Sequence, residues 1–236
     1  MTSLSVIIPA YNEERRLPAT LERVLAWMAS QSLEFGEVIV VNDGSADGTA
    51  VLVEGLLGAH PSLRLINNPG NRGKGYSVRN GVMEARGEWV LFSDADLSTP
   101  IEDVTRLFEA AADAHADIAI GSRAVDRSLV SKRQSPLREL SGRCFNLVMR
   151  TVTGLPFRDT QCGFKLYRAT AAREVFSRQK LDGFSFDVEV LYIAQRLGIP
   201  AVEVPVRWAN VEGTKVSAFN GLRSFADLVR IRTHRT

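Results

Sequence analysis

The chain has 236 residues, of which 45% are hydrophobic and 24% are charged, an ordinary globular composition that argues against disorder. Its formal net charge is only +2, from 29 basic and 27 acidic side chains, so we expect no nucleic-acid partner. The two cysteines, Cys144 and Cys162, are too few for a disulfide framework and lack metal-ligand spacing. They predict buried thiols in a reducing compartment.

An apolar run over residues 4–8 ends at Pro9 and predicts a strand rather than a signal peptide. No stretch approaches the roughly 18 consecutive apolar residues that a membrane-spanning helix needs. We therefore expect a cytoplasmic protein whose membrane contact, if it has one, is peripheral.

The first half of the chain alternates short β-branched runs with helical patterns. This alternation predicts parallel strands joined by crossover helices. The expected strands cover residues 4–8, 37–41, 63–66, 88–92 and 117–120, and the expected helices cover 14–29, 46–57, 74–85 and 101–112. Ligands of such sheets bind beyond the carboxyl ends of the strands, so the loops there are the expected site.

After Gly121 the alternation stops. The pattern then predicts a basic loop, a helix over residues 137–152, a loop through Gly163, two further helices and a strand over 201–204. No internal repeat, low-complexity tract or linker interrupts the chain. We therefore expect one α/β domain over residues 1–236.

The strand expected over residues 88–92 leads into Asp94-Ala95-Asp96. Side chains at i and i+2 of an extended chain point the same way, so both carboxylates are expected to face one side. Mg²⁺ is typically held by one or two carboxylates plus substrate phosphates, which makes the pair a candidate metal site on a diphosphate. The alternative is a capping arrangement supplied by the helix start that follows: Thr99, Pro100 and Glu102.

The loops after the first two expected strands carry polar side chains at the same edge. Tyr11 can flank a base or ribose, and Glu13 and Asp43 can accept hydrogen bonds from them. The alternative is helix capping by Asn12 and Ser45.

A third loop, residues 71–75, opens the helix expected at Lys74. Free backbone donors and a lysine at a helix start can bind an anion. The loop lacks the spacing of a Walker A or dinucleotide motif, so a glycine-rich turn with a solvated lysine is the alternative.

Four segments together, residues 6–13, 41–49, 71–81 and 93–96, resemble the GT-A glycosyltransferases of family 2 in order and spacing. The resemblance covers essentially the whole chain. It implies a Rossmann-like, mostly parallel sheet flanked by helices, and metal-dependent sugar transfer from a nucleotide diphosphate donor. The implied sites are Pro9, Ala10, Tyr11, Glu13, Asp43, Gly73, Lys74, Asp94 and Ala95 for the donor, and Asp94 with the catalytic Asp96 for Mg²⁺ or Mn²⁺.

The second half is similar to the polyprenyl-phosphate branch of that family, which includes enzymes that make dolichyl-phosphate glucose and dolichyl-phosphate mannose. Residues 121–123, 159–165 and 183–190 carry the likeness, and the last two segments favour the glucose enzymes. Lys215 falls where the branch places a lysine near the donor diphosphate. Residues 1–121 are then the nucleotide-sugar half and residues 122–236 the acceptor and lipid half.

The resemblance implies UDP-glucose as donor and polyprenyl phosphate as acceptor, with GDP-mannose as the alternative donor. Two departures bear on this: Asn42 replaces an aspartate common in relatives, and Ser98 replaces a glutamine metal ligand of mannosyl relatives, which disfavours GDP-mannose. Because a phosphate monoester is largely dianionic at neutral pH, it needs no general base, and a single displacement gives a β-linked product. The candidates for binding its phosphate are Arg123, which is also the second catalytic candidate, Arg138 and Ser141, with Arg143 as a rival.

Two other functions stay open. A soluble glycan hydroxyl as acceptor would need a carboxylate base, for which Asp187 and Glu189 are the nearest candidates, unless they belong to a structural helix. A non-catalytic nucleotide-sugar binding module is the alternative of a different class, although the intact Asp94 and Asp96 pair argues against it.

Basic residues are concentrated between positions 123 and 150, where the sequence has seven basic and two acidic residues. Two helical patterns, over residues 137–152 and 219–229, combine a wide apolar arc with arginines. Core packing is the commoner reason for such a pattern, but here it also predicts contact with a peripheral membrane surface.

Overall fold

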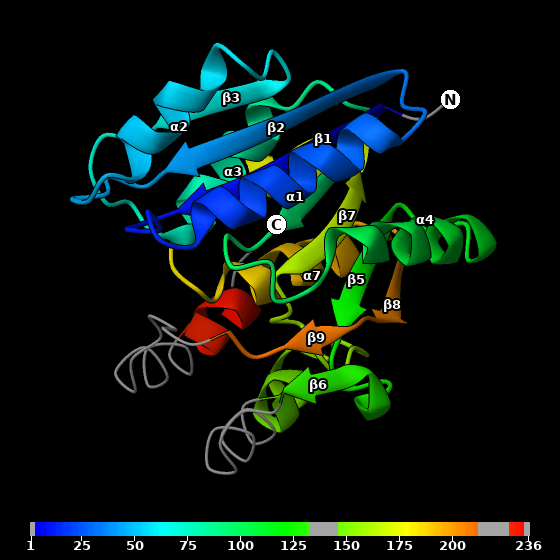
Figure 1. Ribbon diagram of the computed structural model, residues 1–236. Coiled ribbons are helices and arrows are strands. Elements are labelled where there is room, and N and C mark those ends of the chain that lie inside the picture. Colours follow the sequence, from blue (N-terminus) through cyan, green and yellow to red (C-terminus); the bar gives the residue numbers. More distant parts are fainter. Residues whose placement is uncertain (1–2, 133–145, 212–226, 234–236) are drawn as a thin grey trace.

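The computed structural model describes residues 3–132, 146–211 and 227–233, and Figure 1 shows their arrangement around one large sheet. The first half follows the predicted alternation of strands and helices. Its elements are β1 (Ser3–Ala10), α1 (Leu17–Ser30), β2 (Phe35–Asn42), α2 (Thr49–Leu57), β3 (Leu63–Asn67), α3 (Lys74–Glu84), β4 (Trp89–Ser93), a 3-10 turn (Ile101–Asp103), α4 (Val104–Asp113) and β5 (Ile118–Ser122). The predicted α/β class is confirmed.

The second half adds short strands and further helices. Its elements are a 3-10 turn (Arg127–Leu129), β6 (Val130–Lys132), a helix over residues 146–153, β7 (Phe164–Arg168), α6 (Ala169–Ser177), α7 (Phe186–Arg196), β8 (Ala201–Pro205), β9 (Trp208–Ala209) and a helix over 227–233. The two predicted helices and the late strand are present, whereas β6, β7 and β9 were not predicted.

The large sheet has seven strands in the order β3-β2-β1-β4-β7-β5-β8, and β6 pairs with β9 in a separate ribbon. β7 runs antiparallel to both of its neighbours, β4 and β5, while the other pairs of the large sheet are parallel. The sequence prediction missed β7 because Lys165 interrupts its apolar pattern, yet this lysine is wholly buried. β7 matters for function because it brings Gly163 beside the end of β4.

The core is divided by the sheet into two apolar clusters. Along β1, Leu4, Val6 and Ile8 enter one cluster and Ile7 the other, as expected of alternating side chains in a strand. The first cluster includes buried residues of α1 and α4, and the second includes those of α3, α6 and α7. Helices therefore cover both faces and leave the ends of the strands open for ligands.

Both predicted amphipathic patterns lie partly outside the described residues. Within the helix over 146–153, Leu147 and Val148 are exposed and Met149 is buried. In the helix over 227–233, Leu228 and Ile231 pack into the core, which is the commoner role of an apolar helix face. No helix of the described chain has the length and apolarity needed to cross a membrane.

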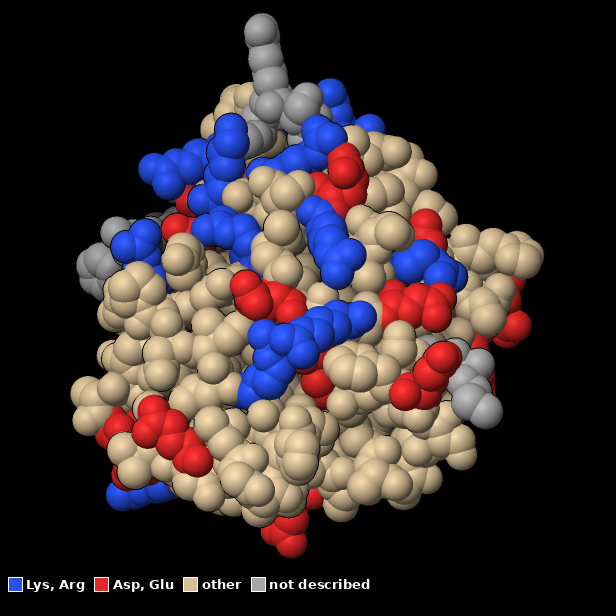
Figure 2. All heavy atoms as spheres, turned by 90° about the horizontal axis from the view of Figure 1, so that it is seen from above, with Lys and Arg blue, Asp and Glu red and all other residues tan. Residues whose placement is uncertain are grey.

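Charged side chains of both signs share the surface seen in Figure 2. Most of the lysine and arginine side chains lie in the upper half of that view, and carboxylates are interspersed among and below them. This face therefore lacks the continuous basic stripe that is typical of nucleic-acid binding.

A buried ion pair joins β7 to α7. The Nζ atom of Lys165 donates to the carbonyl oxygen of Cys162 at 2.6 Å and also contacts the carboxylate of Asp187. Burial raises the pKa of Asp187 above its usual value, against the opposing effect of Lys165 and Lys74. The pair fixes the turn that precedes β7.

The thiol of Cys162 lies in this buried region, as predicted. Burial raises its pKa to about 12, so the group stays a neutral thiol at physiological pH. Cys144 lies outside the described residues.

Breaking this ion pair should destabilise the fold. Lys165→Met leaves Asp187 buried without its partner, and we expect the free energy of unfolding to fall by about 3 kcal/mol or more. In urea unfolding, the double variant Lys165→Met/Asp187→Leu should recover much of that loss because neither charge then remains. A double variant that loses the sum of the two single effects would contradict this account.

Candidate functional site

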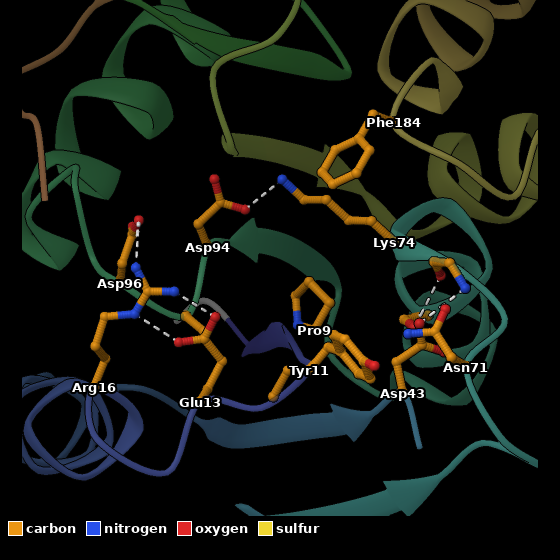
Figure 3. A pocket seen from close by; sticks show the side chains of 14 residues that line it. Pro9, Tyr11, Glu13, Arg16, Asp43, Asn71, Lys74, Asp94, Asp96 and Phe184 are labelled. Carbon is orange, nitrogen blue, oxygen red and sulfur yellow. Dashed lines mark hydrogen bonds and ion pairs between the residues drawn. The ribbon is translucent and has the colours of Figure 1, made fainter. Parts of the chain in front are cut away.

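A pocket of about 350 Å³ opens at the carboxyl ends of β1, β2 and β4 (Figure 3). It brings together the predicted donor and metal residues that the structure describes: Pro9, Ala10, Tyr11, Glu13, Asp43, Gly73, Lys74, Asp94, Ala95 and Asp96. Lys215 lies outside the described residues. The pocket also contains residues that the sequence analysis did not assign: Arg16, Asn71, Ser77 and Phe184.

The first two loops are tied to each other. The backbone N–H of Asn12 donates to Ser45 Oγ at 2.9 Å, and its side-chain oxygen accepts from the N–H of Ala46 at 2.8 Å. The residue before α1 and the residue before α2 make no side-chain capping hydrogen bond, so the alternative of helix capping by Asn12 and Ser45 does not apply. These side chains instead hold the two pocket loops together.

Asp43 organises the third loop of the pocket. Its carboxylate accepts hydrogen bonds from the N–H groups of Arg72 at 2.9 Å and Gly73 at 2.8 Å, and from the Asn68 side chain at 2.8 Å. Gly73 has a φ of 105°, and a Cβ there would lie 2.4 Å from the carbonyl oxygen of Asp182. The tight path of this loop therefore depends on both Asp43 and a glycine.

Several backbone N–H groups at the start of α3 that were predicted to be free have partners in this chain. Those of Arg72 and Gly73 bind Asp43, and those of Gly75 and Tyr76 donate to the carbonyl oxygen of Asp182. The helix start is packed against the loop before α7, which uses up these donors. The side chain of Lys74 remains a candidate for binding an anion at this loop, because it lines the pocket.

Glu13 forms an ion pair with Arg16 of the same chain. The Nε and Nη2 atoms of Arg16 lie 2.7 and 2.5 Å from its two carboxylate oxygens, and Nη1 of Arg16 lies 3.8 Å from Asp96 (Figure 3). Glu13 thus holds Arg16 between two carboxylates. The i, i+3 spacing of Glu13 and Arg16 was the sequence signal that could have identified this pair.

Asp94 and Asp96 line the same pocket, but not because the chain is extended. β4 ends at Ser93, and the N–H of Leu97 donates to the carbonyl oxygen of Asp94 at 3.2 Å, which closes a turn. The sequence analysis expected Asp94 and Asp96 to lie on an extended segment, and this expectation was wrong. The two carboxylates share the pocket because the turn directs them there.

The predicted helix-capping arrangement after the aspartate pair is also absent. The 3-10 turn begins at Ile101 without a side-chain cap, and Glu102 pairs with Arg23 at 2.9 Å. The hydroxyl of Thr99 lies 4.0 Å from the sulfur of Cys162 instead. These residues leave both aspartates to the pocket.

Asp94 rests directly against the turn before β7. Its N–H donates to the carbonyl oxygen of Gly163 at 3.0 Å, and a Cβ on Gly163 would lie only 2.0 Å from the Asp94 carboxylate. On its other side, Oδ1 of Asp94 lies 2.7 Å from Nζ of Lys74. The missing side chain of Gly163 thus makes room for this carboxylate.

A divalent cation fits the chemistry of this carboxylate pair. Mg²⁺ and Mn²⁺ prefer oxygen ligands, and they commonly use one or two carboxylates with phosphate and water oxygens. No group of three or more histidine, cysteine, aspartate or glutamate side chains that could hold a metal occurs in the described parts of the chain. A metal on Asp94 and Asp96 would therefore need ligands in addition to the acidic, histidine and cysteine side chains of the described residues, and substrate and water oxygens are suitable.

Arg123 does not line this pocket and binds Asp159. Its Nε and Nη2 atoms donate to the two carboxylate oxygens at 2.7 and 2.8 Å, and its guanidinium lies 5.4 Å from the ring centre of Trp208. Although burial opposes the effect, Arg123 holds the pKa of Asp159 below its usual value. The other acceptor-phosphate candidates, Arg138, Ser141 and the rival Arg143, lie outside the described residues.

The two candidate base carboxylates are engaged in the core. The Glu189 carboxylate accepts hydrogen bonds from the N–H groups of Lys180 and Leu181, and Asp187 contacts Lys165. Both side chains are almost fully buried, and neither lines the pocket. These contacts support the alternative that Asp187 and Glu189 belong to a structural helix and do not act as bases.

The Asp43 contacts predict a local effect of mutation. Asp43→Asn replaces one acceptor oxygen by an NH₂ group facing N–H donors, so the free energy of unfolding should fall by about 1–3 kcal/mol. Amide hydrogen exchange at Arg72 and Gly73 should become faster. The same change at exposed Asp113 is the control, and unaltered exchange in Asp43→Asn would refute the assigned role.

Comparisons with known proteins agree with this geometry. Residues 5–176 match the family model described as glycosyl transferase family 2. A dolichyl-phosphate beta-glucosyltransferase from Dictyostelium discoideum is 40% identical over 241 residues, covering 97% of this chain and 73% of that protein. The Homo sapiens protein of the same name is 38% identical over 242 residues, covering 97% of this chain and 74% of that protein.

Solved structures support the fold. Glucosyl-3-phosphoglycerate synthase from Mycobacterium tuberculosis, in complex with Mn²⁺, UDP-glucose and phosphoglyceric acid, aligns with a TM-score of 0.69 at 17% identity, covering 100% of this chain and 81% of that one. This likeness confirms the predicted GT-A architecture. With a family match over most of its length and relatives near 40% identity, the chain belongs to glycosyl transferase family 2.

Proposed function

We propose that the protein transfers glucose from UDP-glucose to a polyprenyl phosphate of the dolichyl type and forms a β-linked lipid phosphosugar. The observation that carries the proposal is the match along 97% of the chain to dolichyl-phosphate beta-glucosyltransferases, together with the acidic pocket at the strand ends. The whole described chain then acts as one domain, with residues 1–121 binding the nucleotide sugar and residues 122–236 the acceptor.

Asp94 and Asp96 are the proposed ligands of Mg²⁺ or Mn²⁺. When bound, the cation would neutralise charge on the donor's diphosphate as it leaves. The Mn²⁺ complexes of the structural neighbour support a divalent cation in this fold. The protein's own contribution is to place two carboxylates in one pocket, with Gly163 leaving room for the first of them.

The nucleoside is proposed to lie between the first two loops. Tyr11 lines the pocket and is 40% exposed, so its side chain is proposed to contact the base or ribose. Pro9, Ala10 and Asp43 form the adjoining wall, and the UDP-glucose complex of the structural neighbour supports a uridine donor. Lys74 supplies positive charge for the diphosphate.

The acceptor phosphate needs alignment rather than a base. A phosphate monoester is largely dianionic at neutral pH and attacks the anomeric carbon directly, with inversion. The engaged states of Asp187 and Glu189 favour this acceptor over a glycan hydroxyl, which would require a free carboxylate. Arg123 is proposed to bind the phosphate with the guanidinium edge that Asp159 does not use, together with Arg138 and Ser141.

We further propose a peripheral position at the cytoplasmic face of a membrane. Leu147 is 67% exposed and Val148 is 38% exposed beside the exposed Arg150, which gives an apolar surface next to a positive charge. Such surfaces bind lipid interfaces that contain anionic headgroups. Absence of binding to anionic liposomes would refute this part of the proposal.

The activity is tested by transfer of radiolabel from UDP-glucose or GDP-mannose to a polyprenyl phosphate in the presence of Mg²⁺ or Mn²⁺. We expect organic-phase label from UDP-glucose, and a loss of at least about 100-fold in Asp96→Asn because a metal ligand is removed. Asp113→Asn, an exposed carboxylate outside the pocket, should behave as the wild type.

Organic-phase label from GDP-mannose but not from UDP-glucose would leave the proposed mechanism unchanged and identify the transferred sugar as mannose. Donor binding that needs metal but yields no lipid product with either donor would reject the lipid acceptor. Full activity of Asp96→Asn would reject the proposed metal site.

A further inference from the structure

A lysine of the pocket already occupies one of the carboxylates that the proposed metal would bind. The Nζ atom of Lys74 lies 2.7 Å from Oδ1 of Asp94, and the two side chains point toward each other across the pocket in Figure 3. A divalent cation and this ammonium group compete for the same negative charge. Metal binding to Asp94 must therefore weaken or displace the Lys74 contact.

The surroundings of Lys74 hold an ammonium group in place without fixing it to one partner. Its side chain is 21% exposed, and Nζ lies 5.2 Å from the ring centre of Phe92 and 5.9 Å from that of Phe184. Aromatic faces attract a cation but do not direct it as a hydrogen-bond acceptor does. The ammonium group can therefore change partners while it stays beside the rings.

A second carboxylate acts on Lys74 from the core side. Asp94 and Asp187 together raise the pKa of Lys74 although burial opposes them. Lys165 contacts Asp187 directly, so this carboxylate already has its own cation. Because Asp187 contacts Lys165, Asp94 is the carboxylate in direct contact with Lys74.

The other carboxylate of the pair has a different arrangement. Arg16 lies 3.8 Å from Asp96, and Glu13 holds its guanidinium by two hydrogen bonds. Asp96 therefore has a weaker contact with a cation that is fixed elsewhere. Of the two carboxylates, Asp94 has the closer cation, and Lys74 contacts one carboxylate where Arg16 contacts two.

We propose that Lys74 is an exchangeable counter-ion: it neutralises Asp94 in the empty site, and passes to the donor's diphosphate when a divalent cation takes its place. The inference rests on the metal-dependent function proposed above. During the exchange a positive charge always lies beside Asp94. Two neighbouring carboxylates repel each other, so Asp94 needs such a charge to stay ionised. It also couples metal entry to diphosphate binding, because the released ammonium group then needs an anion.

The proposal makes two predictions of opposite sign for Lys74→Met. Removing the competitor should tighten binding of Mn²⁺ to the donor-free protein by about tenfold, a value reduced from the full Coulomb interaction because the pair is partly exposed. The same variant should bind UDP at saturating Mn²⁺ about tenfold more weakly, because it has lost a charge for the diphosphate. A lysine with a purely structural role would not improve metal binding.

The test is a titration of the full chain with Mn²⁺, followed through the electron paramagnetic resonance signal of the free ion, and a calorimetric titration with UDP. Arg72→Met is the charge-matched control, because Arg72 is exposed, lies over the Tyr76 ring and does not line the pocket. Lys74→Gln is the second variant if Lys74→Met does not fold, and thermal unfolding checks both.

Tighter Mn²⁺ binding and weaker UDP binding in the Lys74 variants, with Arg72→Met close to wild type, would support the exchange. Mn²⁺ affinity that is unchanged or lowered in the folded Lys74 variants would overturn it and leave the proposed function intact. An equal gain in Arg72→Met would also overturn it, since net charge alone would then explain the effect. A wild-type protein that binds no Mn²⁺, even with UDP, would reject the exchange and the metal-dependent function together.

Discussion

The pocket depends on one constraint: each carboxylate at this edge of the sheet needs a partner that offsets its negative charge. Parallel strands place their carboxyl ends together, and here this brings four acidic side chains around one space: Glu13, Asp43, Asp94 and Asp96. Each has a partner of its own chain, either backbone N–H groups or a basic side chain. The partners differ in how easily they are replaced, and this difference separates the loop-forming acids Asp43 and Glu13 from the proposed metal ligands Asp94 and Asp96.

Asp43 and Glu13 belong to the first kind. Asp43 is bound by N–H groups of the loop it shapes, and Glu13 is bound by a nearby arginine through two hydrogen bonds. The Asp94 carboxylate contacts the ammonium group of Lys74, and the Asp96 carboxylate accepts one hydrogen bond from the N–H of Ser98 at 3.0 Å and lies 3.8 Å from the guanidinium of Arg16. A cation that enters the pocket can therefore replace the partners of the aspartate pair at lower cost than those of the other two acids.

Sequence patterns were sufficient for the strands and helices that follow regular apolar periods, and for the pocket residues that sit directly after those strands. They failed at β7, because the buried Lys165 breaks the apolar run and its compensation by Asp187 comes from a distant helix. They left open which partner a polar side chain takes: helix capping was an alternative for Asn12, which instead joins two loops. The role of Arg16 depends on where the Asp96 turn lies, which local spacing does not specify.

Inverting transfer of glucose to a lipid phosphate fixes the anomeric configuration of the product, which can be measured. The purified protein would be incubated with UDP-glucose, a polyprenyl phosphate and Mn²⁺, and the extracted lipid studied by proton and phosphorus magnetic resonance. The account predicts a β-glucosyl phosphate diester, because one displacement inverts the α-linked donor. An α-linked product, or glucose attached to a hydroxyl instead of a phosphate, would contradict it.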